Sequence, residues 1–549
     1  MRILWPVKLL LGISRDATTV WRSSLFAVRL VALVMASVAF SGVLWVTEPA
    51  GPGYQAASAA YLSAAQSLAS GQGYRVPTAD WASPDSISPL TRYPPGYPTA
   101  LSVPVRMGFP PAQAARLVEA VSAFVAMAAL LAVVGDSVGP VAAALLGLAL
   151  LAMPMMVDLH LSVLSEPLFV ACVALTFALM VAAPDAVFAA GLCAALAVSV
   201  RYAGIAVVGA LVAWTLLRSG SWQQRTRRAA TAALPGALVA GTWMWIVHRA
   251  LAGGAVVAGP ASAIGAGGPA VNDGVGAAVA GAAATIGRWL VPTPTGAVWA
   301  RWVAVPAAAA LAALVAVGTR RAYRLWRLLP KDMALTSSTN VPQLLAARVL
   351  GASAVFAATY SAVLIGAVVF TDRSVSVGDR MLAPVLLLGS AGIAVAIASW
   401  WRSAGRPWRA AVVAALVLWG TASFRVSRAH AHEALTYGFD FANDVWRRSQ
   451  LLEWVRNDGN QRDVYSNWPA AVYLHVGRAA RGLPADGADA ATLRAFADTL
   501  RSRDGGRGVV LEFRALNPAY VSADSLIAQA GLQVLATYPD GRVLGAPQP

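Results

Sequence analysis

The chain has 549 residues, of which 58% are hydrophobic and only 12% charged, against roughly 25% charged residues in soluble domains, so most of it is expected to lie in lipid. Its formal net charge of +16 does not indicate nucleic-acid binding, because the Lys and Arg residues lie in short segments between apolar runs and form no basic face with interleaved aromatic residues. The two cysteines, Cys172 and Cys193, both fall inside apolar runs and support neither a disulfide framework nor a thiolate metal site.

The apolar runs begin at residue 26, after a basic lead that contains Arg2, Lys8, Arg15 and Arg22. That lead is too long for a signal peptide, and no clear small-residue cleavage site follows the first apolar run, which ends at Val46. The first run is therefore predicted to be a retained membrane helix. A helix needs about 20 apolar residues to cross the hydrocarbon layer. The runs that meet this length are 26–46, 115–134, 140–157, 166–183, 229–251, 302–319, 348–371, 381–400 and 408–424.

The run from 186 to 217 is too long for one ordinary pass and carries Arg201 near its middle. We predict two short helices that meet at Arg201, which gives about eleven passes. The basic clusters at 218–228, 320–331 and 402–409 then share the side of the basic N-terminus, as the positive-inside rule requires. A single pass would move these charges to the other side and strand an arginine in mid-membrane, at a cost of a few kcal/mol.

This assignment places the N-terminus in the cytoplasm and nearly all long loops on the outer side. The outer segments are 47–114, 158–165, 252–301, 372–380 and the chain after about residue 425. A protein with such unequal loops is expected to work at its outer face. The loop 252–301 is rich in Gly and Ala, which is typical of a lid, a partly embedded cover or simple disorder.

After the membrane domain, 1–424, the pattern changes to charged helices and short strands. We expect strands at 463–466 and 508–513, helices at 469–478, 491–502 and 522–530, and a closing hairpin around 539–541. The fold class is therefore mainly α, a polytopic helix bundle with outer loops and a small extracytoplasmic α/β domain at 425–549. This domain has no Gly-rich phosphate loop, so acceptor recognition or an accessory role is favoured over catalysis.

The first outer loop begins with an amphipathic segment whose apolar face carries Tyr61, Leu62, Ala65 and Leu68, and which ends at Gly71. Such a helix suits the membrane surface, and a purely structural interfacial helix would explain it. The loop continues with Arg92-Tyr93-Pro94-Pro95-Gly96-Tyr97-Pro98.

Several motifs, in this order along the chain, resemble the C-type glycosyltransferase superfamily, which includes protein mannosyltransferases and the lipid A aminoarabinose transferase. They are the surface helix from Tyr61 to Tyr74, the Tyr93–Pro98 motif, Ser165-Glu166-Pro167, Arg201-Tyr202-x-Gly204, Asp379-Arg380 and, in the tail, Tyr465-Ser466-Asn467-x-Pro469 with Tyr473. The resemblance implies transfer of a sugar from a polyprenyl-phosphate carrier to a glycan, lipid or protein acceptor. It also implies work at the outer face of the bacterial cytoplasmic (inner) membrane.

A carrier phosphate lies at the outer headgroup level, so cations are expected at helix ends there. Guanidinium groups suit phosphate because they offer paired donors in a fixed plane and stay charged. The candidate substrate-binding residues are Arg92, Arg201, Arg380, Tyr61, Tyr93, Tyr97, Tyr202 and His160. Arg380 has a simpler alternative role, which is to pair with Asp379 or Asp372.

Transfer also needs a general base, usually a carboxylate at the outer mouth. Bacterial relatives usually carry an Asp shortly before the position of Tyr61, where this chain has Ala57 and Ser58. The candidate catalytic acids are Glu48, Asp158 and Glu166. Glu48 is the nearest substitute in sequence. Two of the three have structural alternatives: Glu166 starts a helix before a proline, and Asp158 with His160 forms a cap or a satisfied polar pair. Asp158 and His160 could also hold a divalent cation.

The missing Asp leaves open a relative that binds the carrier without catalysis. A membrane transporter is a further alternative, although only one broken stretch, around Arg201, is found and transporters tend to repeat such breaks in two halves. A glycan polymerase or ligase would use the same carrier but would not need the Tyr-Pro-Pro-Gly-Tyr-Pro loop. No cofactor is firmly implied, and no metal ligands are assigned.

Overall fold

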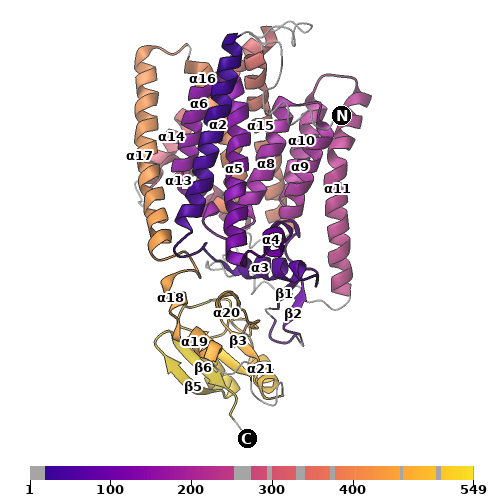
Figure 1. The fold of residues 1–549 in the computed structure, drawn as a ribbon, viewed down its shortest axis with the longest axis vertical. Coiled ribbons are helices and arrows are strands. Elements are labelled where there is room, and N and C mark those ends of the chain that lie inside the picture. Colours follow the sequence, from indigo (N-terminus) through magenta and orange to yellow (C-terminus); the bar gives the residue numbers. More distant parts are fainter. Residues whose placement is uncertain are drawn as a thin grey trace.

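The computed structural model describes residues 19–78, 80–83, 85–252, 274–293, 300–328, 341–370, 377–401, 403–457, 462–502 and 508–547. The basic lead before residue 19 and the parts 253–273 and 294–299 of the predicted outer loop lie outside these residues. The described chain forms a long helical bundle with a small sheet-containing domain at one end (Figure 1).

Seven helices in the described part of the chain are long and apolar enough to cross a membrane. They are α2 (Thr19–Val46), α5 (Pro111–Val138), α11 (Trp222–Ala252), α14 (Ala300–Leu328), α15 (Val341–Phe370), α16 (Asp379–Trp401) and α17 (Arg406–Thr436). The pair α6 (Pro140–Ala152) and α7 (Pro154–His160) forms a further span bent by 66°. The other three predicted passes correspond to the shorter apolar helices α8 (Glu166–Ala182), α9 (Val187–Val200) and α10 (Gly204–Leu217), which have 17, 14 and 14 residues.

The predicted reversal of the chain at Arg201 is present. Arg201 follows α9 in an extended conformation, and the amide of Gly204 then donates to the Arg201 carbonyl over 2.8 Å to start α10. A Cβ on Gly204 would lie 2.3–2.5 Å from backbone atoms of Ala197 and Val198, so only glycine lets α10 begin so close to the last turn of α9. Two helices therefore meet at Arg201.

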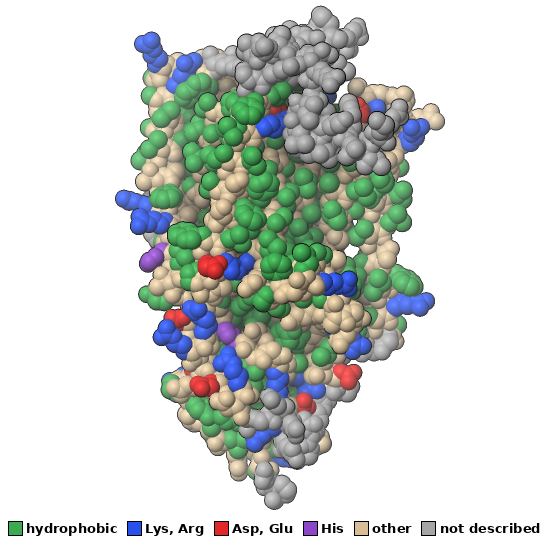
Figure 2. All heavy atoms as spheres, viewed as in Figure 1, with side chains coloured by type: hydrophobic (Ala, Val, Ile, Leu, Met, Phe, Trp, Pro, Cys, Tyr) green, Lys and Arg blue, Asp and Glu red, His purple; other side chains and the backbone are tan. Residues whose placement is uncertain are grey.

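Small residues let the helices approach one another closely, as is usual in membrane bundles. A Cβ on Gly191 of α9 would lie 2.5 Å from the carbonyl oxygen of Ala232 in α11, and one on Gly135 of α5 would lie 2.4 Å from Val28 of α2. Hydrophobic side chains cover most of the visible face of the bundle, while many charged side chains gather toward the end that carries the C-terminal domain (Figure 2). The polytopic helical architecture predicted from the sequence is confirmed.

The predicted outer loop 252–301 contains a helix, α13 (Gly274–Leu290), which packs against α14, α15 and α16. Arg288 near its end pairs with Asp379, the first residue of α16, at 3.2 Å. This part of the loop is therefore a packed helix.

The segment predicted to be the first outer loop, 47–114, folds onto the end of the bundle and keeps that name below. It contains α3 (Ala56–Ala69), the short antiparallel strands β1 (Arg75–Pro77) and β2 (Ile87–Pro89), and α4 (Gly96–Arg106). Ser58 accepts from the Gln55 amide at 2.8 Å and so fixes the first turn of α3. Helix α3 lies across the bundle end, between the membrane helices and the C-terminal domain (Figure 1).

The C-terminal domain contains a four-stranded sheet with helices packed on it. Its elements are α18 (Asp444–Arg447), α19 (Gln450–Asn457), β3 (Val464–Ser466), α20 (Pro469–Val476), α21 (Ala490–Ser502), β4 (Val509–Phe513), α22 (Ala523–Ala530), β5 (Gln533–Tyr538) and β6 (Gly541–Gly545). The strand order is β3-β4-β6-β5, with β3 and β4 parallel and the other pairs antiparallel. This is the predicted α/β domain, including its closing hairpin.

Candidate functional site

Three motifs that are far apart in the sequence meet at the start of α8. Glu166, the first residue of that helix, is 1% exposed. Its Oε1 atom accepts from Arg201 Nη1 at 2.7 Å and from Arg380 Nε at 2.6 Å. Arg201 comes from the turn between α9 and α10, and Arg380 from the first turn of α16. Three separate helix ends thus build one charged cluster.

This cluster carries more positive than negative charge. Two guanidinium groups share one carboxylate, and they stay 21% and 37% exposed while the Glu166 side chain is buried. Arg201 also donates to Ser165 Oγ at 3.0 Å, and Arg380 Nη1 donates to Gln55 Oε1 at 2.6 Å. These bonds fix the orientation of the two guanidinium planes. The positive charge that Glu166 does not compensate suits a phosphate.

Tyrosines of the first outer loop pack beside this cluster. The Tyr61 ring centroid lies 4.9 Å from those of both Tyr93 and Tyr97, and the Tyr61 hydroxyl lies 3.2 Å from Ser165 Oγ. Desolvation raises the pKa of the buried Tyr61 phenol above its ordinary value. Tyr97 is fully buried and donates to Glu119 of α5. Tyr61 therefore contacts the arginine cluster through Ser165, and Tyr97 anchors α4 to the bundle.

The remaining predicted residues lie around this centre with partners of their own. Glu48 accepts from Arg116, and its side chain is 71% exposed. Asp158 Oδ1 lies 2.8 Å from His430 Nδ1 of α17. His160 is buried, with Nδ1 2.8 Å from the Met156 carbonyl oxygen of its own helix. Tyr202 accepts from Trp243 Nε1 at 3.1 Å.

These contacts bear on the possible cation site. His160 Nδ1 bonds within α7, and Asp158 pairs with His430 of another helix, so both residues have partners other than each other. Among the described residues, no group of three His, Cys, Asp or Glu side chains is close enough to hold a metal ion.

Sequence reasoning missed Asp440, which lies in the turn between α17 and α18. Its backbone pairs with Tyr54, and its carboxyl lies near Gln55, the residue before α3. Desolvation raises the pKa of the Asp440 carboxyl above its usual range, although the residue keeps a solvent-exposed face. The sequence offered no signal for this acid, because only the folded chain brings position 440 to position 55.

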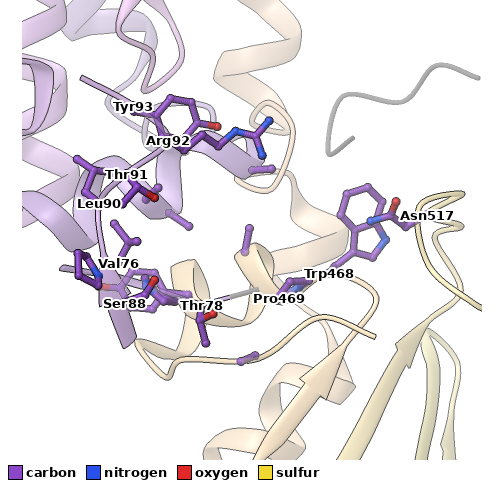
Figure 3. Close-up of a pocket in the computed structure, with 18 of the residues that line it drawn as sticks. Val76, Thr78, Ser88, Leu90, Thr91, Arg92, Tyr93, Trp468, Pro469 and Asn517 are labelled. Atoms are coloured by element: carbon purple, nitrogen blue, oxygen red, sulfur yellow. The ribbon is translucent and has the colours of Figure 1, made fainter. Parts of the chain in front are cut away.

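A cleft opens between the first outer loop and the C-terminal domain. Its volume, including the open mouth, is about 890 Å³. Arg92, Tyr93 and the β1–β2 region form one wall, and Trp468, Pro469 and Asn517 line the opposite side (Figure 3). Arg92 therefore lines this cleft, whereas the Glu166 cluster involves Arg201 and Arg380. Tyr93 belongs to the cleft and also packs on Tyr61.

Comparisons with known proteins support the fold. No protein-family model matches the sequence. No curated protein matches it either. Among solved structures, ArnT from Cupriavidus metallidurans bound to undecaprenyl phosphate matches 97% of this chain and 100% of its own, with 15% identity and a TM-score of 0.51. The arabinofuranosyltransferase AftD from Mycobacteria matches 94% of this chain and 40% of its own, with 15% identity and a TM-score of 0.55.

The match to ArnT runs over nearly all of both chains and so includes the bundle, the surface helix and the C-terminal domain. The resemblance predicted from the motifs is thereby confirmed at the level of the fold. This chain is a multi-pass membrane protein with the fold of the C-type glycosyltransferases.

Proposed function

We propose that this protein is an integral-membrane glycosyltransferase that moves a sugar from a polyprenyl-phosphate carrier to an acceptor. The observation that carries the proposal is the convergence of Arg201 and Arg380 on the single buried carboxylate of Glu166. Arg201, Arg380 and Glu166 together carry one net positive charge at the end of an apolar bundle, which suits a lipid phosphate whose tail lies in the bilayer and whose head lies at the surface. The fold shared with ArnT, which is bound to undecaprenyl phosphate, supports the same ligand class.

The two arginines act on the leaving group. When an acceptor oxygen attacks the anomeric carbon, the bond to the carrier phosphate breaks and negative charge grows on the phosphate oxygens. Donors already held in place stabilise this charge without the cost of reorganisation. Ser165 and Gln55 hold the two guanidinium groups in place, because each bonds to one of them.

The acceptor enters through the cleft beside the first outer loop. Tyr93 supports this route, since it lines the cleft and stacks on Tyr61, which in turn contacts Ser165 of the arginine cluster. The C-terminal domain supplies the other side of the cleft through Trp468 and Asn517. Its role is therefore acceptor recognition.

Sidedness follows from charge. Arg218 and Arg228 lie at the bundle end away from the C-terminal domain, where both pair with Asp185, and we place this basic end in the cytoplasm. The cluster, the cleft and the C-terminal domain then face the outside of the bacterial cytoplasmic membrane.

The proposal is tested with the full chain in lipid nanodiscs. The donors are undecaprenyl phosphates that carry radiolabelled mannose, glucose, arabinose or aminoarabinose, and an extract of the cell envelope supplies acceptors. Wild type should transfer label from one of them, and Arg201→Ala and Arg380→Ala should each lower the rate. Arg218→Ala is the matched control, because it also removes a paired arginine but at the opposite end. Normal transfer by both site variants would refute the phosphate assignment.

A further inference from the structure

The segment that contains Asp440 is tied directly to the start of the first outer loop. The amide of Phe441 donates to the Tyr54 carbonyl over 3.0 Å, and Tyr54 and Asp440 form a parallel bridge. On the other side, Gly53 bonds with the backbone of Leu161 and Val163 at 2.8 Å each. The stretch 53–54 is thus held between the segment that leads to Glu166 and the segment that follows α17.

The Asp440 side chain extends the network of the arginine cluster. Asp440 pairs through its backbone with Tyr54, so its carboxylate lies near the next residue, Gln55, whose Oε1 accepts from Arg380 Nη1 at 2.6 Å. Arg380 in turn donates to Glu166. Asp440 therefore places a carboxylate near Gln55, two positions before Ala57, where the expected Asp is missing.

The backbone at Asp440 is held in an unusual conformation. Its φ is 50°, which no other non-glycine residue in the described part of the chain shares in the positive range. Asp tolerates the left-handed region better than most residues, but it still costs free energy relative to an ordinary conformation. Such strain persists where the surrounding structure imposes it, and here the bonds to Tyr54 impose it.

The other candidate acids are already engaged. Glu166 is buried under two arginines, Glu48 pairs with Arg116, and Asp158 pairs with His430. Asp440 lies near the neutral amide of Gln55, and its side chain is solvent-exposed. A carboxylate with free access and no guanidinium bonded to it is the better proton acceptor.

We propose that Asp440 is the general base of the transfer reaction, a role that rests on the proposed function. The acceptor hydroxyl oxygen forms a bond to the anomeric carbon while the bond from that carbon to the phosphate oxygen breaks. The carrier phosphate leaves with the electron pair of that bond. The hydroxyl proton goes to the Asp440 carboxylate, which later releases it to water.

The test compares Asp440→Asn with wild type in the nanodisc assay. Asn has nearly the same shape and also tolerates a positive φ, so the variant should fold normally. We expect kcat to fall by about 10²–10⁴-fold, the usual contribution of a general base. The dissociation constant for undecaprenyl phosphate should stay unchanged. Asp444→Asn, at the first residue of α18 and four positions further along the chain, is the matched control and should keep full activity.

The pH profile gives a second readout. The groups that face Asp440 are Gln55, Arg380 and Asp158, and Asp158 in turn is bonded to His430. Desolvation raises the pKa of Asp440, so wild-type kcat/KM should fall as the pH drops through a value above the ordinary Asp range. This acidic limb should be absent from the residual activity of Asp440→Asn.

The outcomes separate the two proposals. Normal transfer by Asp440→Asn, or an unchanged acidic limb, overturns the base assignment and leaves the phosphate site intact. Loss of carrier binding together with turnover also overturns it, because a positioning role through Gln55 and Arg380 would explain that result. No transfer by wild type with any donor refutes the proposed function and the base with it.

Discussion

Arg380 Nε donates to Glu166 Oε1 over 2.6 Å, although the two residues are 214 positions apart in the sequence. The neighbouring Asp379 pairs instead with Arg288 of α13, at 3.2 Å. In the first turn of α16, Asp379 therefore faces α13 and Arg380 faces the start of α8. This division explains why Arg380 is available to the cluster and is not neutralised by the residue beside it.

Glu166→Gln tests whether that carboxylate serves to hold the two arginines. The change keeps the shape but removes the charge that compensates Arg201 and Arg380, so the apo protein should be less stable. Breaking a fully buried pair costs about 3–5 kcal/mol, and the loss should be smaller here because both guanidinium groups remain partly exposed. Undecaprenyl phosphate should then raise the thermal midpoint more in the variant than in wild type. Equal shifts in both proteins would contradict this role.

Arg380→Lys tests whether a positive charge at this position is enough to bind the carrier phosphate. Arg380 uses Nε and Nη1 for two different partners, Glu166 and Gln55, and a lysine ammonium cannot reproduce that planar pair of donors. Hydrogen bonds to charged groups contribute about 1.5–3 kcal/mol. Affinity for undecaprenyl phosphate should therefore fall about 10- to 100-fold in equilibrium binding. Arg218→Lys, at the opposite bundle end, should bind as wild type does, and an unchanged affinity in both variants would show that a point charge suffices.

Local pattern was enough to predict the helices, the reversal at Arg201 and the C-terminal strands. Apolar length decides whether a segment spans the membrane, and an arginine near the middle of an overlong apolar run marks a break. The loop 252–301 was harder, because its Ala-rich and Gly-rich composition fits a loop as well as the helix α13 that the structure contains.

Contacts between segments that are distant in the chain could not be predicted from the sequence. The residues Glu166, Arg201 and Arg380 were each singled out, but their common contact depends on how α8, α9, α10 and α16 pack. The pairing of Asp158 with His430 and the proximity of Asp440 to Gln55 depend on the position of the chain after α17. No periodicity or motif specifies that position.

Gly204→Ala should disturb the reversal that presents Arg201. The added Cβ would lie 2.3–2.5 Å from the backbone of α9, and backbone cannot move aside cheaply. Overpacking of this kind costs about 1–3 kcal/mol, so the thermal midpoint should fall and carrier binding should weaken. Gly366→Ala in α15 meets nothing within 4 Å and is the control, expected to be neutral or stabilising. If both variants behave alike, the close approach of α10 to α9 at Gly204 determines neither stability nor carrier binding.

Tyr473→Phe tests the docking of the C-terminal domain. The Tyr473 hydroxyl donates to Gln66 Oε1 at 2.9 Å and joins α20 to α3 beside the cleft. Loss of one hydrogen bond costs about 0.5–1.5 kcal/mol, so hydrogen exchange in α20 should quicken and the KM for the acceptor should rise. Binding of undecaprenyl phosphate should not change. Tyr538→Phe in β5 is the control, and an acceptor KM that rises equally there would argue against a specific contact.

Sidedness is tested by cysteine labelling in intact cells. In a background with Cys172 and Cys193 replaced by Ser, single cysteines are placed at Ser221, between α10 and α11, and at Leu516, which is 87% exposed in the C-terminal domain. The basic end near Arg218 should face the cytoplasm, because Lys and Arg near membrane helices are retained there. A membrane-impermeant maleimide should therefore label position 516 and spare position 221 until the cells are permeabilised. The reverse pattern would place Arg201, Arg380 and Asp440 in the cytoplasm, and transfer from an outward-facing carrier would then be impossible.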